Sequence, residues 1–398
     1  MCIRDRYYHV DPTWDSKRAG VCVCALMQPD AIIFSNVGPG CRWVGNEYGS
    51  AGRTCWGTMN VGEQTPSSPA DCDILNEGEA NGDTWVAAET DVSIRPGWFW
   101  RESENDKVKS IQQLLKIYYE SVGRNSLLLL NVPADTRGLL HEVDSVRLME
   151  LRAAIDEIFS TDLAAGASVE ASAVRGGSRK YAAANILDED YDAYWTVDDE
   201  VTTASFTVTL PEARTFNRVQ LQEYIPLGQR VAAFSIEALG EDGVWKTIAN
   251  ETTVGYKRIV HTPVTTATAV RVNIEESLAC PVINGFALYM DNIYVSEEKA
   301  NIPVGEVKPA SEALTLDLGE ARTLKGFTYA PIYKGEGGCI VTYDLEASVD
   351  GSVWTKVYEG KMFENIINNP TSREVMFDAP LKAKALRLTP VRVEISAG

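Results

Sequence analysis

Residues 42–49, RWVGNEYG, place one carboxylate, Glu47, among aromatic and apolar residues in a loop that contains two glycines. Such surroundings suit acid–base chemistry, because apolar neighbours raise the pKa of a carboxylic acid and keep it protonated near neutral pH. The alternative is a packed loop in which Glu47 pairs with Arg42. Most glutamates are solvated, so this stretch alone favours the second interpretation.

Other kinds of catalytic chemistry find less support in the sequence. There are three histidines, His9, His141 and His261, and none lies near a GxSxG motif, so a Ser–His or Cys–His pair has little basis. The eight cysteines form no CxxC pair and have no histidine at zinc-binding spacing. We expect them to be free or buried thiols, which leaves carboxylate chemistry as the better hypothesis.

Length and charge restrict the class of protein. A chain of 398 residues predicts two or three domains. The net charge of −19, with no cluster of Lys and Arg, argues against nucleic acid as a partner, whereas a neutral sugar carries no such penalty. There is no apolar run of about 18 residues that would span a membrane. The first residues, MCIRDRYYHV, lack the apolar core of a signal peptide, and we expect that Met1 is not the natural start.

The first part of the chain, residues 1–160, alternates strand and helix patterns. A capping box at Ser110 and Gln113 predicts the start of a helix that ends near Gly123, and a second helix is expected over 144–159. Apolar strands separated by helices indicate a parallel α/β sheet. Three strands do not close a (β/α)₈ barrel, which takes roughly 250 residues, so barrel sequence here would be its C-terminal half only. The strands are expected at 31–37, 85–94 and 126–132.

From residue 161 the chain shows short alternating runs separated by turns, which is typical of β-sandwiches. The pattern also repeats: residues 206–226, 234–248 and 269–274 match 314–333, 343–357 and 385–390. We therefore expect one β-sandwich over 161–295 and a second, shortened one over 296–398. Trp245 and Trp354 occupy corresponding strand positions and are expected in the two cores. The first strands are expected at 205–210, 218–224, 233–239 and 269–274.

Three blocks of the first part, residues 34–60, 88–100 and 121–142, resemble glycoside hydrolase family 29, the α-L-fucosidases, and most of all its branch acting on α-1,3/1,4-linked fucose. The resemblance covers about residues 14–158. The two repeats resemble discoidin or coagulation-factor 5/8 type C domains, jelly-roll sandwiches that often accompany such enzymes as carbohydrate-binding modules.

The resemblance implies a (β/α)₈ TIM-like barrel and a retaining mechanism that uses two carboxylates. It places Glu47 as the general acid/base, with Trp43 and Tyr48 as the flanking aromatics that would desolvate it. The nucleophile of the family is an Asp in a WFDG-type segment about 45 residues earlier. No such segment is present, since Asp5, Asp11 and Asp15 lack the right neighbours, so we expect that the nucleophile is absent from this chain.

Further residues are weaker candidates for the same site. Trp98, in RPGWFW, is a candidate platform for a sugar face or a core aromatic. Arg95 is a candidate for bonding sugar hydroxyls, although holding Glu89 or Asp91 is the favoured alternative. Those two acids lie on a strand near the expected active-site end and are expected to belong to a charge network.

Residues 185–195, NILDEDYDAYW, resemble a loop that binds structural Ca²⁺ in discoidin-type domains. Asp188 and Asp190 are the expected ligands, and a solvated acidic turn is the alternative. Glu189 and Ala193 stand where Gly and Thr are usual, which weakens the match. Catalysis itself is expected to need no cofactor.

The leading hypothesis is therefore a fragment of a secreted or periplasmic α-L-fucosidase that releases terminal fucose from oligosaccharides or glycoproteins and is inactive without its nucleophile. The competing hypothesis is a non-catalytic carbohydrate-binding protein with a degenerate barrel remnant. A third is a different hydrolase that uses Asp11 or Asp15 as nucleophile.

Overall fold

The computed structural model describes residues 32–35, 40–60, 72–294, 312–329, 339–363 and 373–394, together with the single residues 27, 331 and 366. The chain divides into two compact units, Met1–Ser296 and Glu297–Gly398. The first unit holds an α/β part and a β-sandwich, so the expected boundary at residue 160 lies within it. No helix in the described part of the chain is long and apolar enough to cross a membrane.

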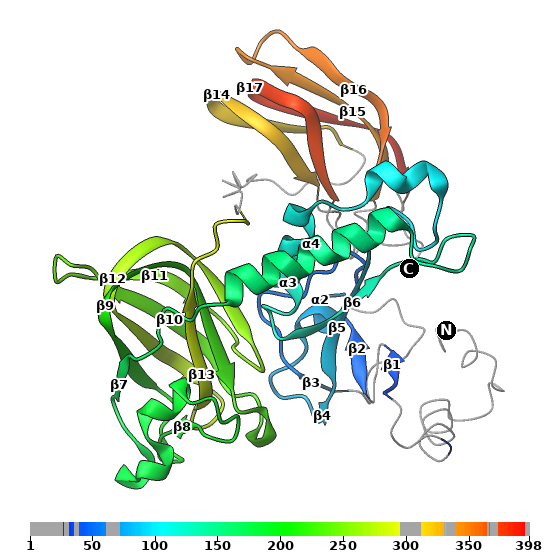
Figure 1. The fold of residues 1–398 in the computed structure, drawn as a ribbon. Coiled ribbons are helices and arrows are strands. Elements are labelled where there is room, and N and C mark those ends of the chain that lie inside the picture. Colours follow the sequence, from blue (N-terminus) through cyan, green and yellow to red (C-terminus); the bar gives the residue numbers. More distant parts are fainter. Residues whose placement is uncertain are drawn as a thin grey trace. The chain divides into compact units, whose positions relative to one another are not determined.

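The α/β part is built on a four-stranded sheet in the order β1-β2-β5-β6, and all its pairs are parallel (Figure 1). Because the strands are parallel, their carboxyl ends meet at one edge of the sheet, where the loops after β2, β5 and β6 emerge. The strands are β1 (Phe34–Ser35), β2 (Cys41–Trp43), β5 (Ala87–Ser93) and β6 (Ser126–Asn131).

Two helices cover one face of this sheet. Helix α3 (Ile111–Ser121) begins with the expected capping box, in which the Ser110 hydroxyl accepts from Gln113 N and the Gln113 side chain accepts from Ser110 N. Helix α4 (Glu142–Phe159) packs against α3. Their apolar side chains form one cluster with Val92 of β5, while Leu128 and Leu130 of β6 pack against it. Because successive side chains of a strand point to opposite faces of the sheet, Leu127 and Leu129 lie on the other face, where they are 51% and 43% exposed.

Short elements complete the α/β part. Strand β3 (Thr58–Met59) pairs with β4 (Thr84–Trp85) in an antiparallel ribbon. Helix α2 (Cys72–Glu77) lies between them in sequence, and the 3₁₀ helix η3 (Glu102–Lys107) precedes α3. The four cysteines whose side chains are described, Cys41, Cys55, Cys280 and Cys339, are free, as expected.

The first sandwich is organised by two long strands that run through both of its layers. Strands β9 and β12 are antiparallel partners over almost their whole lengths, with irregularities in register after His261 and after Ala267. The first part of β9 and the last part of β12 form one layer with β7, β10 and β11. The last part of β9 and the first part of β12 form the other layer with β13 and β8. The strands are β7 (Ser168–Ala171), β8 (Trp195–Thr196), β9 (Ala204–Glu223), β10 (Val231–Leu239), β11 (Trp245–Glu251), β12 (Arg258–Ser277) and β13 (Val282–Tyr289).

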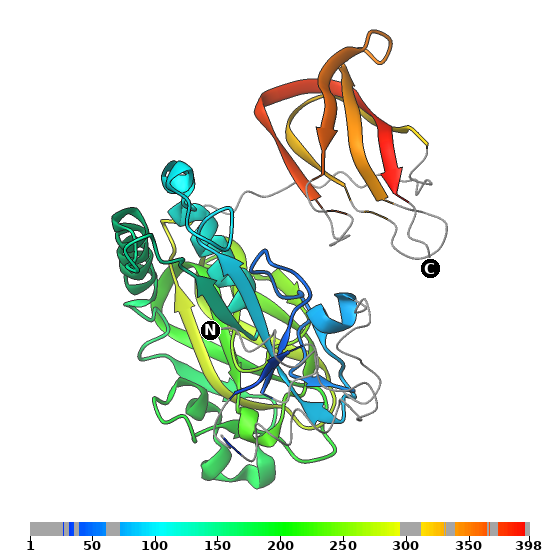
Figure 2. The ribbon, with the colours of Figure 1, turned by 90° about the vertical axis from the view of Figure 1, so that its right-hand side faces the viewer.

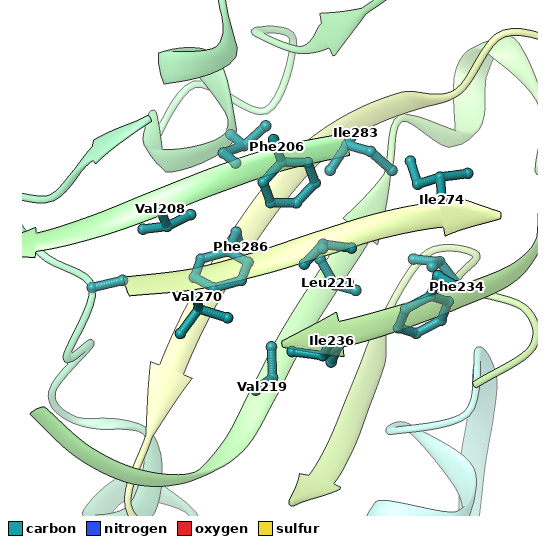
Figure 3. Close-up of a cluster of buried hydrophobic side chains, with 14 of the residues drawn as sticks. Phe206, Val208, Val219, Leu221, Phe234, Ile236, Val270, Ile274, Ile283 and Phe286 are labelled. Carbon is teal, nitrogen blue, oxygen red and sulfur yellow. The ribbon is translucent and has the colours of Figure 1, made fainter. Parts of the chain in front are cut away.

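The core of this sandwich lies between the two layers (Figure 3). Phe206 and Ile236 come from one layer, and Val219, Leu221 and Phe286 from the other. All five are at most 4% exposed, and such burial of apolar area is the main stabilising term for a fold of this kind. The expected strands 205–210 and 218–224 are thus two halves of the single strand β9.

The second unit repeats this arrangement. The four strands in its described residues have the order β14-β17-β15-β16, which matches β9-β12-β10-β11 of the first sandwich, so the predicted repeat is confirmed. The core contains Tyr343 and Phe363 stacked at 4.3 Å, with Tyr329 stacked on Phe363 at 4.6 Å. The strands are β14 (Leu314–Tyr329), β15 (Cys339–Ser348), β16 (Thr355–Met362) and β17 (Arg373–Glu394).

The expectation that Trp245 and Trp354 are core residues is wrong. Both indoles are only partly buried and lie outside the core clusters. Arg271 lies 3.9 Å above the Trp245 ring and Arg387 lies 4.2 Å above the Trp354 ring. Each indole therefore packs as the partner of a guanidinium, a cation–π arrangement that alternation along the strand did not reveal.

The α/β part and the first sandwich share buried surface within the first unit. Ile259 of β12 belongs to the helix cluster, and Tyr294 packs against it. The Tyr119 hydroxyl of α3 donates to Asp291 at 2.6 Å, and Arg218 of β9 pairs with the same carboxylate at 2.9 Å. Figure 2 shows the blue and cyan sheet segments lying against the green strands of the sandwich.

Candidate active site

Glu47 lies four residues beyond the end of β2, at the carboxyl edge of the parallel sheet. The turn that carries it is fixed by Asn46, whose side-chain amide donates to Ser50 O at 2.8 Å and whose Oδ1 accepts from Tyr48 N at 3.1 Å. Gly49 has φ 75° and packs so tightly that a Cβ there would lie 2.8 Å from the Ile117 side chain. The backbone is thus held in place while the Glu47 side chain is exposed.

The indole of Trp98 contacts Glu47 directly. Its Nε1–H donates to Glu47 Oε2 at 2.9 Å, and Trp98 O in turn accepts from the Asn131 side chain at 3.1 Å. Trp98 lies in the loop after β5, so two neighbouring strand-end loops converge on one carboxylate. This contact orients a carboxylate that can give a proton to a bound molecule or take one from water. Arg42 is not its partner, contrary to the packed-loop alternative.

Side chains of β2 and β5 pair on the sheet face opposite the helices. The Trp43 indole N–H donates to Asp91 Oδ1 at 2.7 Å, so Trp43 is engaged with β5 instead of covering Glu47 as expected. The Cys41 thiol donates to Glu89 Oε2 at 3.2 Å, and burial raises the pKa of Cys41 to about 12. The carboxylates of Glu89 and Asp91 therefore lie on the sheet face opposite the helices, and each accepts a hydrogen bond from a side chain of β2.

Arg42 points to the other side of the sheet, as the alternation of β2 requires. It is completely buried and donates to Leu75 O at 2.9 Å and to Val86 O at 2.7 Å. Burial lowers its pKa. Its role is to hold helix α2 and the β4–β5 connection to the strand that precedes the candidate acid.

The expectation that Arg95 contacts substrate does not fit the geometry. Its side chain is completely buried, and its Nε donates to both carboxylate oxygens of Asp144 at 2.9–3.0 Å. The remaining guanidinium nitrogens donate to Asn105 Oδ1 and Arg101 O. Arg95 thus ties the loop after β5 to the start of α4. This partner is neither Glu89 nor Asp91, the two acids considered from the sequence. Asp144 lies 49 residues away along the chain, so no local pattern indicated it.

The first sandwich holds the far end of the Glu47 loop. Gln229 Oε1 accepts from Gly57 N at 2.7 Å while its Nε2 donates to Cys55 O at 2.9 Å. Thr253 Oγ1 accepts from Cys55 N at 2.8 Å, and Arg258 donates to Arg53 O at 2.6 Å. These groups are at most 9% exposed, apart from Arg53. Sequence reasoning missed this clamp because nothing local links residues that lie 172 to 205 positions apart.

Asp188 and Asp190, the predicted calcium ligands, lie in an acidic turn, and calcium binding there stays a prediction. The Oδ1 atom of Asp188 accepts from Asp190 N, and that of Asp190 accepts from Asp192 N, both at 3.0 Å, as in successive Asx turns. Asp192 Oδ1 instead accepts from the Tyr224 hydroxyl at 2.9 Å. Among the residues with described positions, no group of three or more His, Cys, Asp or Glu side chains is arranged to hold a metal ion. The geometry fits the solvated acidic turn better.

Comparison with known families assigns both sandwiches. The F5/8 type C domain model matches residues 168–289 and 303–397, which are the two repeats found in the sequence and in the strand order.

The α/β part extends the likeness to a group of glycosidases. α-L-Fucosidase 1 of Arabidopsis thaliana is 39% identical over 296 residues, which are 72% of this chain and 56% of that protein. A glycoside hydrolase 29 family member from an unknown rumen bacterium is 30% identical with a TM-score of 0.60, over 94% of this chain and 63% of that one. A Ruminococcus gnavus GH29 fucosidase, solved with fucose, is 31% identical with a TM-score of 0.57, over 64% and 51% of the two chains. This chain spans about half the length of the curated relatives that it matches. It belongs to the F5/8 type C domain family through its two sandwiches, and over most of its length it is a relative of the glycoside hydrolase 29 α-L-fucosidases.

Proposed function

We propose that this chain is part of a retaining α-L-fucosidase in which Glu47 is the general acid/base. The observation that carries the proposal is the position of Glu47 at the carboxyl edge of a parallel sheet, with its carboxylate bonded by Trp98 at 2.9 Å. In parallel α/β folds the strand-end loops at this edge form the active site. The fucosidase relatives support this choice of chemistry over other carboxylate reactions.

In the proposed reaction, Glu47 protonates the oxygen of the leaving group while a second carboxylate attacks the anomeric carbon. Glu47 then takes a proton from the water that hydrolyses the glycosyl-enzyme. The second carboxylate is proposed to come from sequence that this chain does not contain, while Asp5, Asp11 and Asp15 lie outside the residues that the structure describes. Without it the chain as printed would not turn over. Trp43 and Trp98 are proposed to border the sugar, since both lie at or near the carboxyl edge.

We further propose that the parallel sheet is the C-terminal half of a (β/α)₈ barrel. Two features support this: Leu127 and Leu129 are exposed on the face without helices, and the matched relatives are much longer. Parallel sheets are normally covered on both faces, so these leucines fit the interior of a closed barrel better than a solvent-facing surface. The substrates would be fucosylated oligosaccharides or glycoproteins, with α-1,3/1,4 linkage, met in the periplasm or outside the cell.

The test compares leaving groups in an enzyme that contains the sequence of this chain and is extended to the length of its relatives. Glu47→Gln is expected to lower kcat/KM by about 10²–10⁴-fold on a fucosyl disaccharide, whose leaving group needs a proton. A nitrophenyl fucoside, whose leaving group needs none, should lose much less. Glu102→Gln, an exposed carboxylate in η3, is the matched control and should leave both rates unchanged. Equal losses on both substrates, or none, would remove Glu47 from the acid/base role.

A further inference from the structure

Asn131, the last residue of β6, connects the carboxyl edge of the sheet to the loop that contacts Glu47. It pairs in register with Ser93, the last residue of β5, and the two strands are parallel neighbours (Figure 1). Its side-chain amide donates to Ser93 Oγ at 2.9 Å and to Trp98 O at 3.1 Å. One side chain therefore bonds both to the start of the loop after β5 and to the residue that donates to Glu47.

The loop from Ser93 to Trp98 is also held by hydrogen bonds at its base. The Ser93 hydroxyl donates to Gly97 O at 2.7 Å and accepts from Arg95 N at 3.3 Å. The backbone oxygen of Ser93 accepts from Lys109 Nζ at 2.6 Å. Ser93 is 6% exposed and Arg95 is completely buried, and a hydrogen bond is electrostatically stronger in such surroundings than in water. The backbone that carries the Trp98 indole is thus fixed from several sides.

The direction of the bonds through Asn131 follows from their acceptors. A carbonyl oxygen such as Trp98 O only accepts, so the atom of Asn131 that faces it is the amide nitrogen and not the amide oxygen. The Ser93 hydroxyl gives its own proton to Gly97 O, so it accepts from the same nitrogen. Aspartate at position 131 would have almost the same shape but would place an oxygen against both acceptors.

The bond from Trp98 distinguishes the two carboxyl oxygens of Glu47. The indole Nε1–H can only donate, and it holds Oε2 at 2.9 Å as an acceptor. In a neutral carboxylic acid the carbonyl oxygen is the better acceptor, and the other oxygen carries the hydrogen. The indole therefore favours the form of neutral Glu47 in which Oε1 carries the proton.

We propose that Asn131 is a positioning residue for the fucosidase reaction, acting through Trp98 to hold the Glu47 carboxyl group with its transferable proton on Oε1. This inference rests on the proposed function, because it concerns the acid that Glu47 supplies. In the step that it serves, the Oε1–H bond breaks and the proton passes to the glycosidic oxygen. The bond from that oxygen to the anomeric carbon breaks, its electron pair stays on the oxygen, and the second carboxylate bonds to the carbon.

The kinetic test is the ratio of kcat/KM on a fucosyl disaccharide to kcat/KM on a nitrophenyl fucoside, in the enzyme extended to the length of its relatives. Both values come from one preparation, so the ratio does not depend on how much of a variant is folded. Asn131→Ala, Asn131→Asp and Trp98→Phe should each lower the ratio about tenfold to a hundredfold, because only the disaccharide needs a well-placed proton. Asn131→Ala combined with Trp98→Phe should lower it no further than Trp98→Phe alone, because Asn131 acts through that indole.

Asn125→Gly is the matched control, because Asn125 immediately precedes β6 and so lies at the opposite end of this strand. Its side chain donates to Cys55 O at 3.0 Å and to Gln229 Oε1 at 3.2 Å, and its φ of 60° is one that glycine adopts readily. The control loses hydrogen bonds of the same kind from the same strand. It should lower stability and leave the ratio unchanged, and a ratio as low as that of Asn131→Ala would show that any weakening of β6 has this effect.

A spectroscopic measurement on the full 398-residue chain needs no activity. In a proton–nitrogen correlation spectrum, the indole signal of Trp98 is the one that disappears in Trp98→Phe. Glu47→Gln should move this signal, because it changes the acceptor of the indole N–H. Asn131→Ala should move it as well, because the indole loses its fixed position, whereas Asn125→Gly should leave it in place.

The outcomes separate this inference from the proposed function. An unchanged ratio in Glu47→Gln removes the acid/base role itself, and this inference with it. A lowered ratio in Glu47→Gln with an unchanged ratio in the Asn131 variants overturns the inference alone, as does an indole signal that Asn131→Ala leaves unmoved. A lowered ratio in the Asn131 variants, together with a moved indole signal and an unaffected control, supports it.

Discussion

Acidification is expected to destabilise the first unit through His261, which lies in β12 at the contact with helix α3. Its ring packs edge-on against Tyr119 at 4.4 Å and against Tyr294 at 5.5 Å, and its buried Nε2 has no hydrogen-bond partner among the described residues. Burial lowers the pKa of His261 to about 3, and the nearby guanidinium of Arg218 acts in the same direction. Asp291, which pairs with Arg218, opposes the shift only in part.

The size of the effect follows from the difference between the folded and unfolded pKa values. An unfolded histidine has a pKa of about 6.5, so between about pH 6.5 and pH 3 the unfolded chain binds a proton that the folded chain does not. The stability contributed by neutral His261 is therefore complete above about pH 6.5 and is lost as pH falls. At about 1.4 kcal/mol per pH unit, the loss is about 2 kcal/mol at pH 5 and at most about 5 kcal/mol near pH 3.

Urea unfolding at pH 7 and pH 5 measures this loss. The chain with His261→Phe, which keeps an apolar ring but cannot be protonated, should lose about 2 kcal/mol less than the unmodified chain over this interval. His141→Gln is the control, because His141 caps helix α4 through its Nδ1 and its ring contacts only the partly buried Trp100 ring, at 5.9 Å, among the described aromatic residues. If the His261→Phe variant and the unmodified chain lose the same stability on acidification, the reasoning about this histidine is refuted.

Two more predictions concern the sandwich side of the first unit. Gln229→Ala should cost about 2–4 kcal/mol in urea unfolding and speed amide exchange at residues 53–58, because Gly57 N–H is left buried without its acceptor and Cys55 O without its donor. A cost below about 1 kcal/mol with unchanged exchange would contradict the assignment. Burial raises the pKa of Glu223 to about 7, although the three backbone N–H groups that donate to it act to lower the pKa. The contribution of Glu223 to stability is therefore complete below about pH 4.5 and is lost as pH rises through 7. The pH slope between 5 and 8 should flatten in Glu223→Gln, and an unchanged slope would show that the carboxylate ionises freely in the folded state.

Local patterns in the sequence predicted those elements whose signals lie within a few residues of one another. The capping box at Ser110 and the apolar runs of β5 and β6 were found because caps and alternation are local. Strand β2 was missed, since three residues centred on a buried Arg42 show no strand pattern. Glu47 was a candidate from sequence, but its contact with Trp98 was not foreseen, because a contact across 51 residues is decided by tertiary packing.

The same limit applies to the charged residues. Arg95 was expected to hold Glu89 or Asp91, with sugar hydroxyls as the other candidate, yet its partner is Asp144 on α4. Asp188 and Asp190 have the composition of a calcium loop, but their oxygens accept backbone N–H groups of their own turn. Composition gives the donors and acceptors that are present, whereas only the fold decides which of them converge.

The clamp made by Gln229, Thr253 and Arg258 has a consequence for how such genes can recombine. A domain that is joined to an enzyme only through a linker can be exchanged for another of its family by joining the sequences at that linker. Here the exchange would leave Gly57 and Cys55 without their buried partners and the Arg53 carbonyl without its guanidinium. The first F5/8 type C domain is thus expected to be inherited together with the α/β part that precedes it, and grafts at residue 160 should fail unless those three side chains are carried along.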